Sequence, residues 1–483
     1  MLIRDAEIDC GEVLDLRVAG GRIAAIGKGL RAGDGEAVVL AEGAALLPGL
    51  RDHHLHLAAL AAAADSVPCG PPQVGDAAGL ERLLRQHASV DGGWLRGIGY
   101  HESVAGEIDR DWLDRCIDTR PVRIQHRGGR LWILNSRALQ ALQVDDDGDD
   151  PLERSGGRLT GRLYEGDRWL RQRLGPSRPD LAAVSLHLAS LGVTGVTDTG
   201  PHNTPEQLGW LRQAQLRGEL RQDLLLMGDA SFDGHAFKAG PGEGEAGLPS
   251  LAVGAHKFHL LESQLPEFDG VVAAIRRSHH AGRNVAFHCV TRAELVFALG
   301  ALDEAGSRPG DRIEHAAVTP PELLQELRRL GLAVVTQPGF VAERGDAYRE
   351  QVEAADWPWL YRLKAFLDAG VPLAGSSDAP FGEAHPWKAM QAAVERRSRG
   401  GCVVGADEAL SPERALRLFT SSLRAPGGRQ CALQPGAAAD LCLLDRPWAA
   451  VRSRLAEASV RMTFRAGTVI WAQSGDPGGA DRP

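Results

Sequence analysis

Short apolar segments alternate with longer amphipathic ones through the second half of the chain, and this alternation constrains the fold more than any other feature. Seven strand-like segments lie at residues 193–199, 223–227, 252–261, 284–290, 312–318, 333–338 and 371–378. Between them, apolar residues recur at helical spacing in segments such as 268–280, 292–305 and 320–330. Strands and helices that alternate in this way are typical of a parallel α/β fold.

An eighth strand-like segment lies far upstream, within residues 47–57, and reads Leu-Pro-Gly-Leu-Arg-Asp-His-His-Leu-His-Leu. Eight parallel strands are the number that closes a (β/α)8 barrel, or TIM barrel. Side chains two residues apart on a strand point to the same face, so His54 and His56 present two imidazoles together. Such a pair could supply two ligands of a divalent metal site. A lone His-x-His is, however, about as often a pair of surface or core histidines with no ligand role.

Both ends of the chain predict small β structure. Residues 1–49 and 426–474 each contain short strand-like runs separated by Gly-rich turns. We expect the two pieces to fold together as one small β-sandwich domain, with the barrel at residues 50–425 inserted between them. Residues 58–190, approximately, fall outside the barrel strands and are expected to form a long insertion after the first strand, over the barrel mouth. The Gly-, Pro- and Asp-rich tail at 475–483 is expected to be disordered.

The composition excludes several classes of protein. The formal net charge is -9 and no basic patch stands out, which argues against a nucleic-acid partner. The longest apolar stretch, residues 57–64, is far too short to span a bilayer, and the N-terminus carries charges instead of the apolar segment of a secretory signal. The seven scattered cysteines include no Cys-x-x-Cys pair, as expected of reduced thiols. We therefore expect a cytoplasmic protein without a membrane partner.

Residues that suit a metal site stand at the ends of later strands, where the active sites of such barrels lie. His288, His315 and Asp378 each close a strand-like segment, and Lys257 lies on the fourth. Only five of the 54 lysine and arginine residues are lysine, so the choice of lysine over arginine at residue 257 needs an explanation. Taken singly, each residue has an ordinary explanation: a hydrogen-bonded histidine, an aspartate at a turn or helix N-cap, a solvated lysine. Their joint placement favours one converging site.

The segment Pro48-Gly49, followed by Asp52-x-His54-x-His56, resembles the signature of the amidohydrolase superfamily. The later strand-end Lys, His, His and Asp are similar to that superfamily's binuclear metal site. The chain looks most like the subgroup of N-substituted formamide deformylase, through motifs at residues 131–139, 192–198, 312–316 and 375–380.

The resemblance implies a ligand set and a reaction. It implies that His54 and His56 bind the more buried of two zinc ions and that His288 and His315 bind the other, with other divalent metals left open. Lys257 would bridge them as a carbamate, unless it only pairs with a carboxylate such as Glu262 or Glu294. Asp378 would be a ligand and the general base, so that a metal-bridging hydroxide hydrolyses a non-peptide C–N bond in an amide, N-formyl amine or N-acyl amine.

The substrate is expected to be a small molecule, and the insertion offers residues that could bind it. The candidates are His101, Arg127, Arg130, Trp132 and Tyr164. Relatives often carry a histidine where Arg130 stands and Gly-Asp-Arg-Ala at residues 290–293, which here read Val-Thr-Arg-Ala. An arginine facing the site would suit a carboxylate or another anionic group.

Four alternatives stay open at this point. A lactone or ester hydrolase could use the same machinery. A deaminase would carry a glutamate three residues after His288, where Thr291 stands, with Glu294 six residues on. A catalytically inactive protein would be expected to have lost ligands, and all six are present. A homodimer is open because relatives are often dimers.

Overall fold

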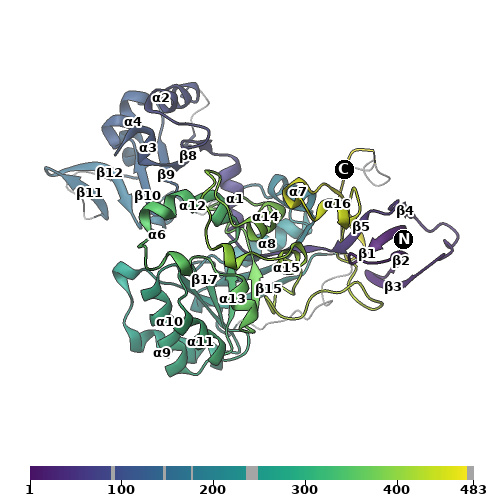
Figure 1. Ribbon diagram of the computed structural model, residues 1–483. Coiled ribbons are helices and arrows are strands. Elements are labelled where there is room, and N and C mark those ends of the chain that lie inside the picture. The colour runs from purple at the N-terminus through teal and green to yellow at the C-terminus, as the bar shows by residue number, and fades with distance from the viewer. Residues whose placement is uncertain (89–92, 145–147, 149, 176–177, 235–247, 476–483) are drawn as a thin grey trace. The chain divides into compact units, whose positions relative to one another are not determined.

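The computed structural model describes residues 1–88, 93–144, 148, 150–175, 178–234 and 248–475. The chain forms two compact units, Met1–Leu57 with Leu181–Pro483, and Ala58–Asp180 (Figure 1). Beyond Gly475, the tail predicted to be disordered lies outside the described residues. None of the described helices has the length and apolar character that a bilayer crossing requires.

Strands from the two ends of the chain join in one sheet within the first unit. The sheet has the order β22-β21-β20-β5-β1-β2-β3, with β4 beside β1. Its strands are β1 (Leu2–Ile8), β2 (Val13–Ala19), β3 (Arg22–Gly27), β4 (Val38–Leu40), β5 (Ala45–Pro48), β20 (Leu441–Leu444), β21 (Val460–Arg465) and β22 (Thr468–Ala472). The ends meet where β20 pairs antiparallel with β5, with Cys442 opposite Leu47.

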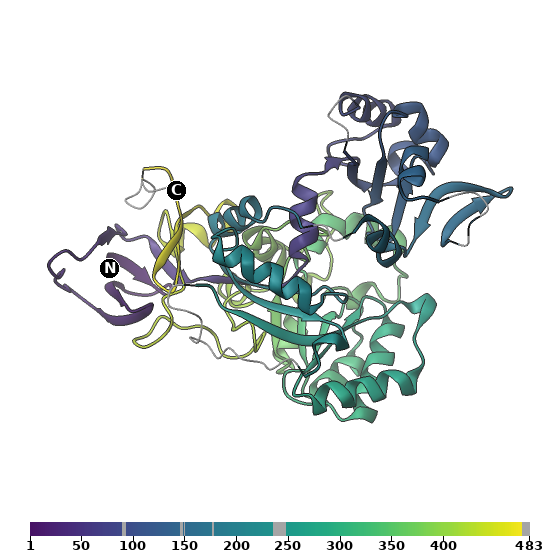
Figure 2. The ribbon, with the colours of Figure 1, turned by 180° about the vertical axis from the view of Figure 1, so that it is seen from behind.

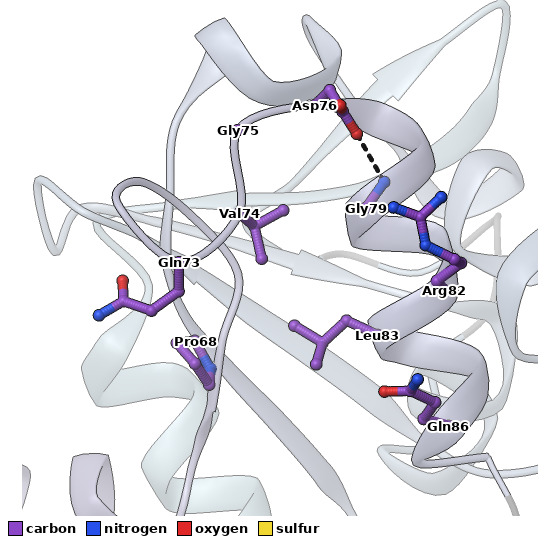
Figure 3. Close-up of a pocket in the computed structure, with 9 residues that line it drawn as sticks. All are labelled: Pro68, Gln73, Val74, Gly75, Asp76, Gly79, Arg82, Leu83 and Gln86. Atoms are coloured by element: carbon purple, nitrogen blue, oxygen red, sulfur yellow. Dashed lines mark hydrogen bonds between the residues drawn. The ribbon is translucent and has the colours of Figure 1, made fainter.

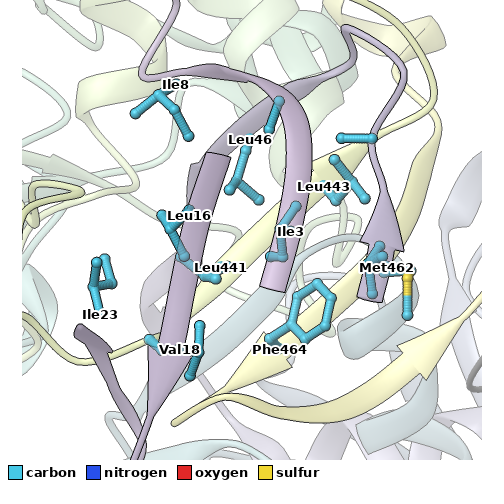
Figure 4. Close-up of a cluster of buried hydrophobic side chains, with 14 of the residues drawn as sticks. Ile3, Ile8, Leu16, Val18, Ile23, Leu46, Leu441, Leu443, Met462 and Phe464 are labelled. Carbon is cyan, nitrogen blue, oxygen red and sulfur yellow. The ribbon is translucent and has the colours of Figure 1, made fainter. Parts of the chain in front are cut away.

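A single hydrophobic cluster joins these terminal strands. Ile3 and Leu16 come from the N-terminal strands, and Leu441, Met462 and Phe464 come from the C-terminal ones (Figure 4). All five are fully buried. Because neither set of strands could bury this face alone, the two ends of the chain stabilise each other.

The eight predicted barrel strands form one parallel sheet in chain order, which confirms the (β/α)8 fold. They are β6 (Leu50–Leu55), β13 (Val193–Asp198), β14 (Asp223–Gly228), β15 (Leu251–His259), β16 (Val285–Cys289), β17 (Arg312–His315), β18 (Ala333–Thr336) and β19 (Leu373–Gly375). The first and last strands meet just beyond β19, where the Asp378 N–H donates to the His54 carbonyl at 2.8 Å. The helices α9 (Phe268–His280), α10 (Arg292–Ala305) and α11 (Pro321–Arg329) lie side by side (Figure 1 and Figure 2), and α9 and α10 contact β16.

The second unit has its own sheet and core. Its strands, in the order β11-β12-β10-β9-β8-β7, are β7 (Val67–Pro68), β8 (Leu95–Tyr100), β9 (Val122–His126), β10 (Leu131–Leu134), β11 (Leu152–Ser155) and β12 (Arg158–Tyr164). A shallow hollow of about 340 Å³ lies between the segment Pro68–Asp76 and helix α2 (Ala77–Gln86), which Asp76 caps by accepting from the Gly79 N–H at 2.7 Å (Figure 3).

This unit ends at Asp180, whereas the sequence predicted an insertion extending to about residue 190. The difference is helix α7 (Ala182–Ser190), which contacts β13, β21 and β22 of the first unit. Val184 and Leu188 are buried there, and the Ala189 carbonyl accepts from the Thr463 hydroxyl at 2.7 Å. Apolar spacing alone does not say which sheet a helix covers, so the boundary could not be read from the sequence.

Candidate metal centre

Histidines from the first barrel strand meet an aspartate beyond the last. Strand β6 ends at Leu55, so His54 lies within it and His56 directly follows it. The Asp378 Oδ1 atom lies 3.3 Å from His54 Nε2 and 3.2 Å from His56 Nε2. Asp378 has a φ of +54°, a left-handed conformation that L-residues other than glycine rarely adopt. The backbone hydrogen bond from Asp378 to the His54 carbonyl holds this turn against the first strand.

Two further histidines lie beside this group. The ring centroid of His315 is 4.9 Å from that of His54 and 4.4 Å from that of His288. The His315 Nδ1 atom hydrogen-bonds to Gln337 Oε1 at 2.7 Å, and the Gln337 amide nitrogen donates to Ser376. Because the amide oxygen can only accept, His315 Nδ1 carries the proton and Nε2 keeps its lone pair. His315 therefore has the tautomer that a metal ligand needs.

Lys257 lies in β15 with its side chain buried in the barrel interior. Its Nζ atom is 3.8 Å from Glu314 Oε1. Burial lowers the pKa of Lys257 to about 8, against the opposing attraction of Glu314. Glu294, one of the two partners expected from the sequence, is engaged elsewhere, in a capping box with Thr291 at the start of α10. The nearest carboxylate is thus Glu314, which the sequence interpretation did not consider.

The charges of the centre are set by burial and by close partners. Burial alone would raise the pKa of Asp378, but His54 and His56 hold that pKa well below its usual range. Burial lowers the pKa of His315 to about 3 and that of His288 well below its ordinary value. His288 and His315 are therefore neutral imidazoles and Asp378 is an ionised carboxylate, the states in which these groups bind metal ions.

Three of the six predicted ligands carry a buried polar atom that has no hydrogen bond among the described residues. These atoms are Lys257 Nζ, His315 Nε2 and Asp378 Oδ1. Buried polar atoms are normally satisfied, so three together fit a group that binds them. His54, His315 and Asp378 offer ligand atoms that all lie within 4.8 Å of one another. Nitrogen and oxygen donors at this spacing suit zinc.

This grouping combines histidines that the sequence interpretation had assigned to two different metal ions. The sequence interpretation assigned His54 with His56 to one ion and His288 with His315 to the other. The group whose ligand atoms lie within 4.8 Å of one another combines His54 with His315, and His56 lies against Asp378 and, at 5.5 Å between ring centroids, Phe381. All six residues lie in one connected group, and the division of ligands between ions stays a prediction.

Glu314 is the residue at this centre that sequence reasoning missed. Its Oε2 atom lies 2.7 Å from His54 Nδ1, and its Oε1 atom accepts from Arg312 Nε at 2.6 Å. Burial would raise the pKa of Glu314, but Arg312, Lys257 and His54 hold that pKa well below its usual range. Its position one residue before His315, in Arg-Ile-Glu-His, was the signal available in the sequence.

The five candidate substrate-binding residues all lie in the second unit, so a role at the centre stays a prediction. His101 caps the short helix α3 (Glu102–Ala105) by accepting from the Ser103 N–H. His101, Glu102 and His126 form a second group whose potential ligand atoms lie within 4.8 Å of one another. In both rings, however, Nδ1 accepts a backbone N–H, which leaves the proton on Nε2 and disfavours metal binding there.

The other candidates have partners within their own unit. Arg130 is half exposed, and its Nε lies 3.3 Å from Glu165 Oε1. The Trp132 indole donates to Asp167 at 2.9 Å, and the Tyr164 hydroxyl accepts from Arg162. The Arg127 N–H donates to the Tyr100 carbonyl at 2.8 Å. Arg130 thus already has a carboxylate beside it, and an anionic substrate would have to compete with Glu165.

Comparison with known proteins identifies a family and a relative that covers nearly the whole chain. The family model "Amidohydrolase family" matches residues 37–471. N-substituted formamide deformylase of Arthrobacter pascens is 27% identical, with 98% of this chain and 97% of that protein covered.

Solved structures share the fold. An uncharacterized metal-dependent hydrolase from Pyrococcus horikoshii has a TM-score of 0.73 at 20% identity, covering 92% of this chain and 97% of that one. Atrazine chlorohydrolase from Arthrobacter aurescens, solved with zinc, has a TM-score of 0.56 at 16% identity, covering 97% and 94%.

Proposed function

Since the chain belongs to the amidohydrolase family and is a metal-dependent hydrolase of carbon–nitrogen bonds, we propose that it cleaves an amide, an N-formyl amine or an N-acyl amine at the centre described above. The six residues that would hold the metal are His54, His56, Lys257, His288, His315 and Asp378. The observation that carries this proposal is the convergence of His54, His315 and Asp378, with unsatisfied buried atoms on the last two.

Asp378 has the position and charge of a general base. A divalent ion at this centre would lower the pKa of a coordinated water to about 7 and polarise the substrate carbonyl. The Asp378 carboxylate would take the proton as the water oxygen attacks the carbonyl carbon, and would then deliver it to the leaving nitrogen as the C–N bond breaks. His54 and His56 flank the same Asp378 oxygen and would keep it ionised.

Lys257 would hold the metal as a carbamate. A neutral amine forms its N–C bond with CO2 and releases a proton, and a pKa of about 8 makes the neutral amine accessible near neutral pH. The product replaces a buried ammonium with two oxygens that can bind cations. Arginine offers no primary amine, which accounts for a lysine in a chain that otherwise uses arginine.

The local structure disfavours deamination. The Glu294 side chain accepts the N–H groups of Val290, Thr291 and Glu262, so it stabilises the start of α10. Thr291, at the spacing of a deaminase glutamate, is the N-cap of that helix. Neither residue is placed as a proton shuttle.

The test is metal analysis together with a hydrolysis screen of metal-loaded protein. We expect about two equivalents of zinc or another divalent metal per chain, and turnover of an N-formyl or N-acyl amine. The variants H54A and H315A should lose both, whereas K364M, which alters an exposed lysine, should keep both. Wild-type protein that binds no divalent metal would contradict the proposal. Turnover of lactones or esters alone would show that the enzyme hydrolyses C–O bonds instead of C–N bonds.

A further inference from the structure

A buried carboxylate connects two of the proposed metal ligands. The two oxygens of Glu314 face different partners: Oε2 lies 2.7 Å from His54 Nδ1, and Oε1 lies 3.8 Å from Lys257 Nζ. His54 comes from strand β6 and Lys257 from β15, so one side chain of β17 contacts ligands from two other barrel strands. The Glu314 side chain is fully buried, and water does not compete for these contacts.

Arg312 fixes the orientation of Glu314. The Arg312 Nε atom donates to Glu314 Oε1 at 2.6 Å, and its Nη2 atom donates to the His53 carbonyl at 3.1 Å. A carboxylate paired with a buried guanidinium is ionised and can only accept hydrogen bonds. His54 must therefore donate from Nδ1, and the neutral imidazole that binds a metal ion then has its lone pair on Nε2, the nitrogen that faces Asp378.

We propose that Glu314 is a positioning residue of the metal centre: it fixes the tautomer and ring orientation of His54 and holds the side-chain nitrogen of Lys257 in place. A ligating histidine commonly donates its second N–H to a carboxylate, which orients the ring and raises its basicity. The role at Lys257 follows from the same geometry. A carbamate nitrogen keeps one N–H, and Glu314 Oε1, 3.8 Å from Lys257 Nζ, is the carboxylate oxygen toward which that N–H would be directed.

This inference rests on the proposed metal centre, and the experiment separates the two. In E314Q the amide is nearly isosteric, but it can offer its oxygen to only one of His54 and Arg312 and turns an N–H₂ toward the other. We expect its affinity for zinc and cobalt to fall by about 10–100-fold, measured by competition with a chromophoric chelator. The visible absorption spectrum of the cobalt-loaded protein should change, because the ring orientation of His54 changes.

A matched control distinguishes positioning from general stability. Asp311 is a buried carboxylate at the opposite end of β17, where it accepts the N–H groups of Val285 and Arg308 at 2.9 Å. D311N should destabilise the fold and leave the metal affinity and cobalt spectrum unchanged. If E314Q unfolds, E314D takes its place, since it keeps the charge beside Arg312 but withdraws the carboxylate from His54, and it should show the same loss of affinity.

The Lys257 contact has its own readout. After equilibration with 13C-labelled bicarbonate, the wild type should show a carbamate resonance in its 13C NMR spectrum that K257A lacks, and E314Q should show it with reduced intensity. A folded E314Q with metal affinity within twofold of the wild type would overturn the role of Glu314 while leaving the metal centre intact. A wild type that binds no metal would overturn both.

Discussion

Replacing Lys257 with methionine should stabilise the metal-free protein, because it removes an ammonium group from the barrel interior. Lys257 is only 5% exposed, and its Nζ atom has no hydrogen bond among the described residues. The Glu314 carboxylate beside it is 3.8 Å away and already paired with Arg312. Methionine has a similar length and no charge, so it can occupy the same space without the cost of desolvation.

The magnitude follows from the pKa of Lys257, which burial lowers from 10.5 in the unfolded chain to about 8 in the folded one. At about 1.4 kcal/mol per pKa unit, this difference corresponds to roughly 3 kcal/mol of lost stability whenever the folded chain carries the charge. The full cost applies below pH 8, where both states are protonated. It shrinks as the pH rises from 8, because the folded chain is then neutral while the unfolded chain still binds the proton, and it vanishes above pH 10.5.

Guanidinium unfolding of metal-free, CO2-depleted protein measures the effect. At pH 7, K257M should be more stable than the wild type by roughly 3 kcal/mol, and at pH 10.5 by less than about 0.5 kcal/mol. K364M makes the same change at an exposed lysine whose Nζ lies 2.5 Å from Asp368, and it should shift stability by less than about 0.5 kcal/mol at both pH values. A K257M variant less stable than the wild type at pH 7, or equally stabilised at both pH values, would refute the reasoning.

Three further variants test other parts of the structure. D378N should lower kcat by about 10²–10⁴-fold with little change in stability, and near-normal turnover would exclude Asp378 as the base. E294A should cost about 1–3 kcal/mol in unfolding experiments by breaking the α10 cap, with kcat/KM within about twofold of the wild type, whereas a large loss of turnover at full metal content would revive a proton-shuttle role. G192A should cost about 2–4 kcal/mol, because Gly192 has a φ of +85° and a Cβ atom there would lie 2.5 Å from Cys442 Sγ. Combining it with C442A should recover part of that loss, and strictly additive effects would disprove the clash.

The parts of the fold that the sequence predicted well are those that periodicity determines. The helices expected at 268–280 and 292–305 have those bounds in the structure, since apolar spacing runs through each element. For α10, Thr291 and Glu294 mark the start as a capping box. The six predicted ligands form one group in the structure because parallel strands bring their carboxyl ends to one side of a barrel, whatever the distance between them in sequence.

Glu314 was not predicted because its strand departs from the regular alternation of side chains. Neighbouring residues on a strand point to opposite faces, so a strand that directs His315 to the metal should direct Glu314 away from it. His315 breaks this rule with a φ of +69°, and both side chains reach the same buried group. Nothing in the sequence signals a left-handed histidine, since glycine is the residue that usually marks that conformation.

These features are unfavourable for the fold, and their concentration at one place is itself an argument for function. His315 at the end of β17, Ala316 after it, and Asp378 beyond β19 all have positive φ, and such conformations cost on the order of 1–3 kcal/mol each. Lys257 adds a buried amine whose Nζ atom has no hydrogen bond among the described residues. Such costs persist only where the surrounding structure enforces them, here through the backbone hydrogen bond from Asp378 to His54 and the Glu314 network. A metal ion that bound these groups would offset the costs together, so metal binding should raise the stability of the wild type more than that of K257M.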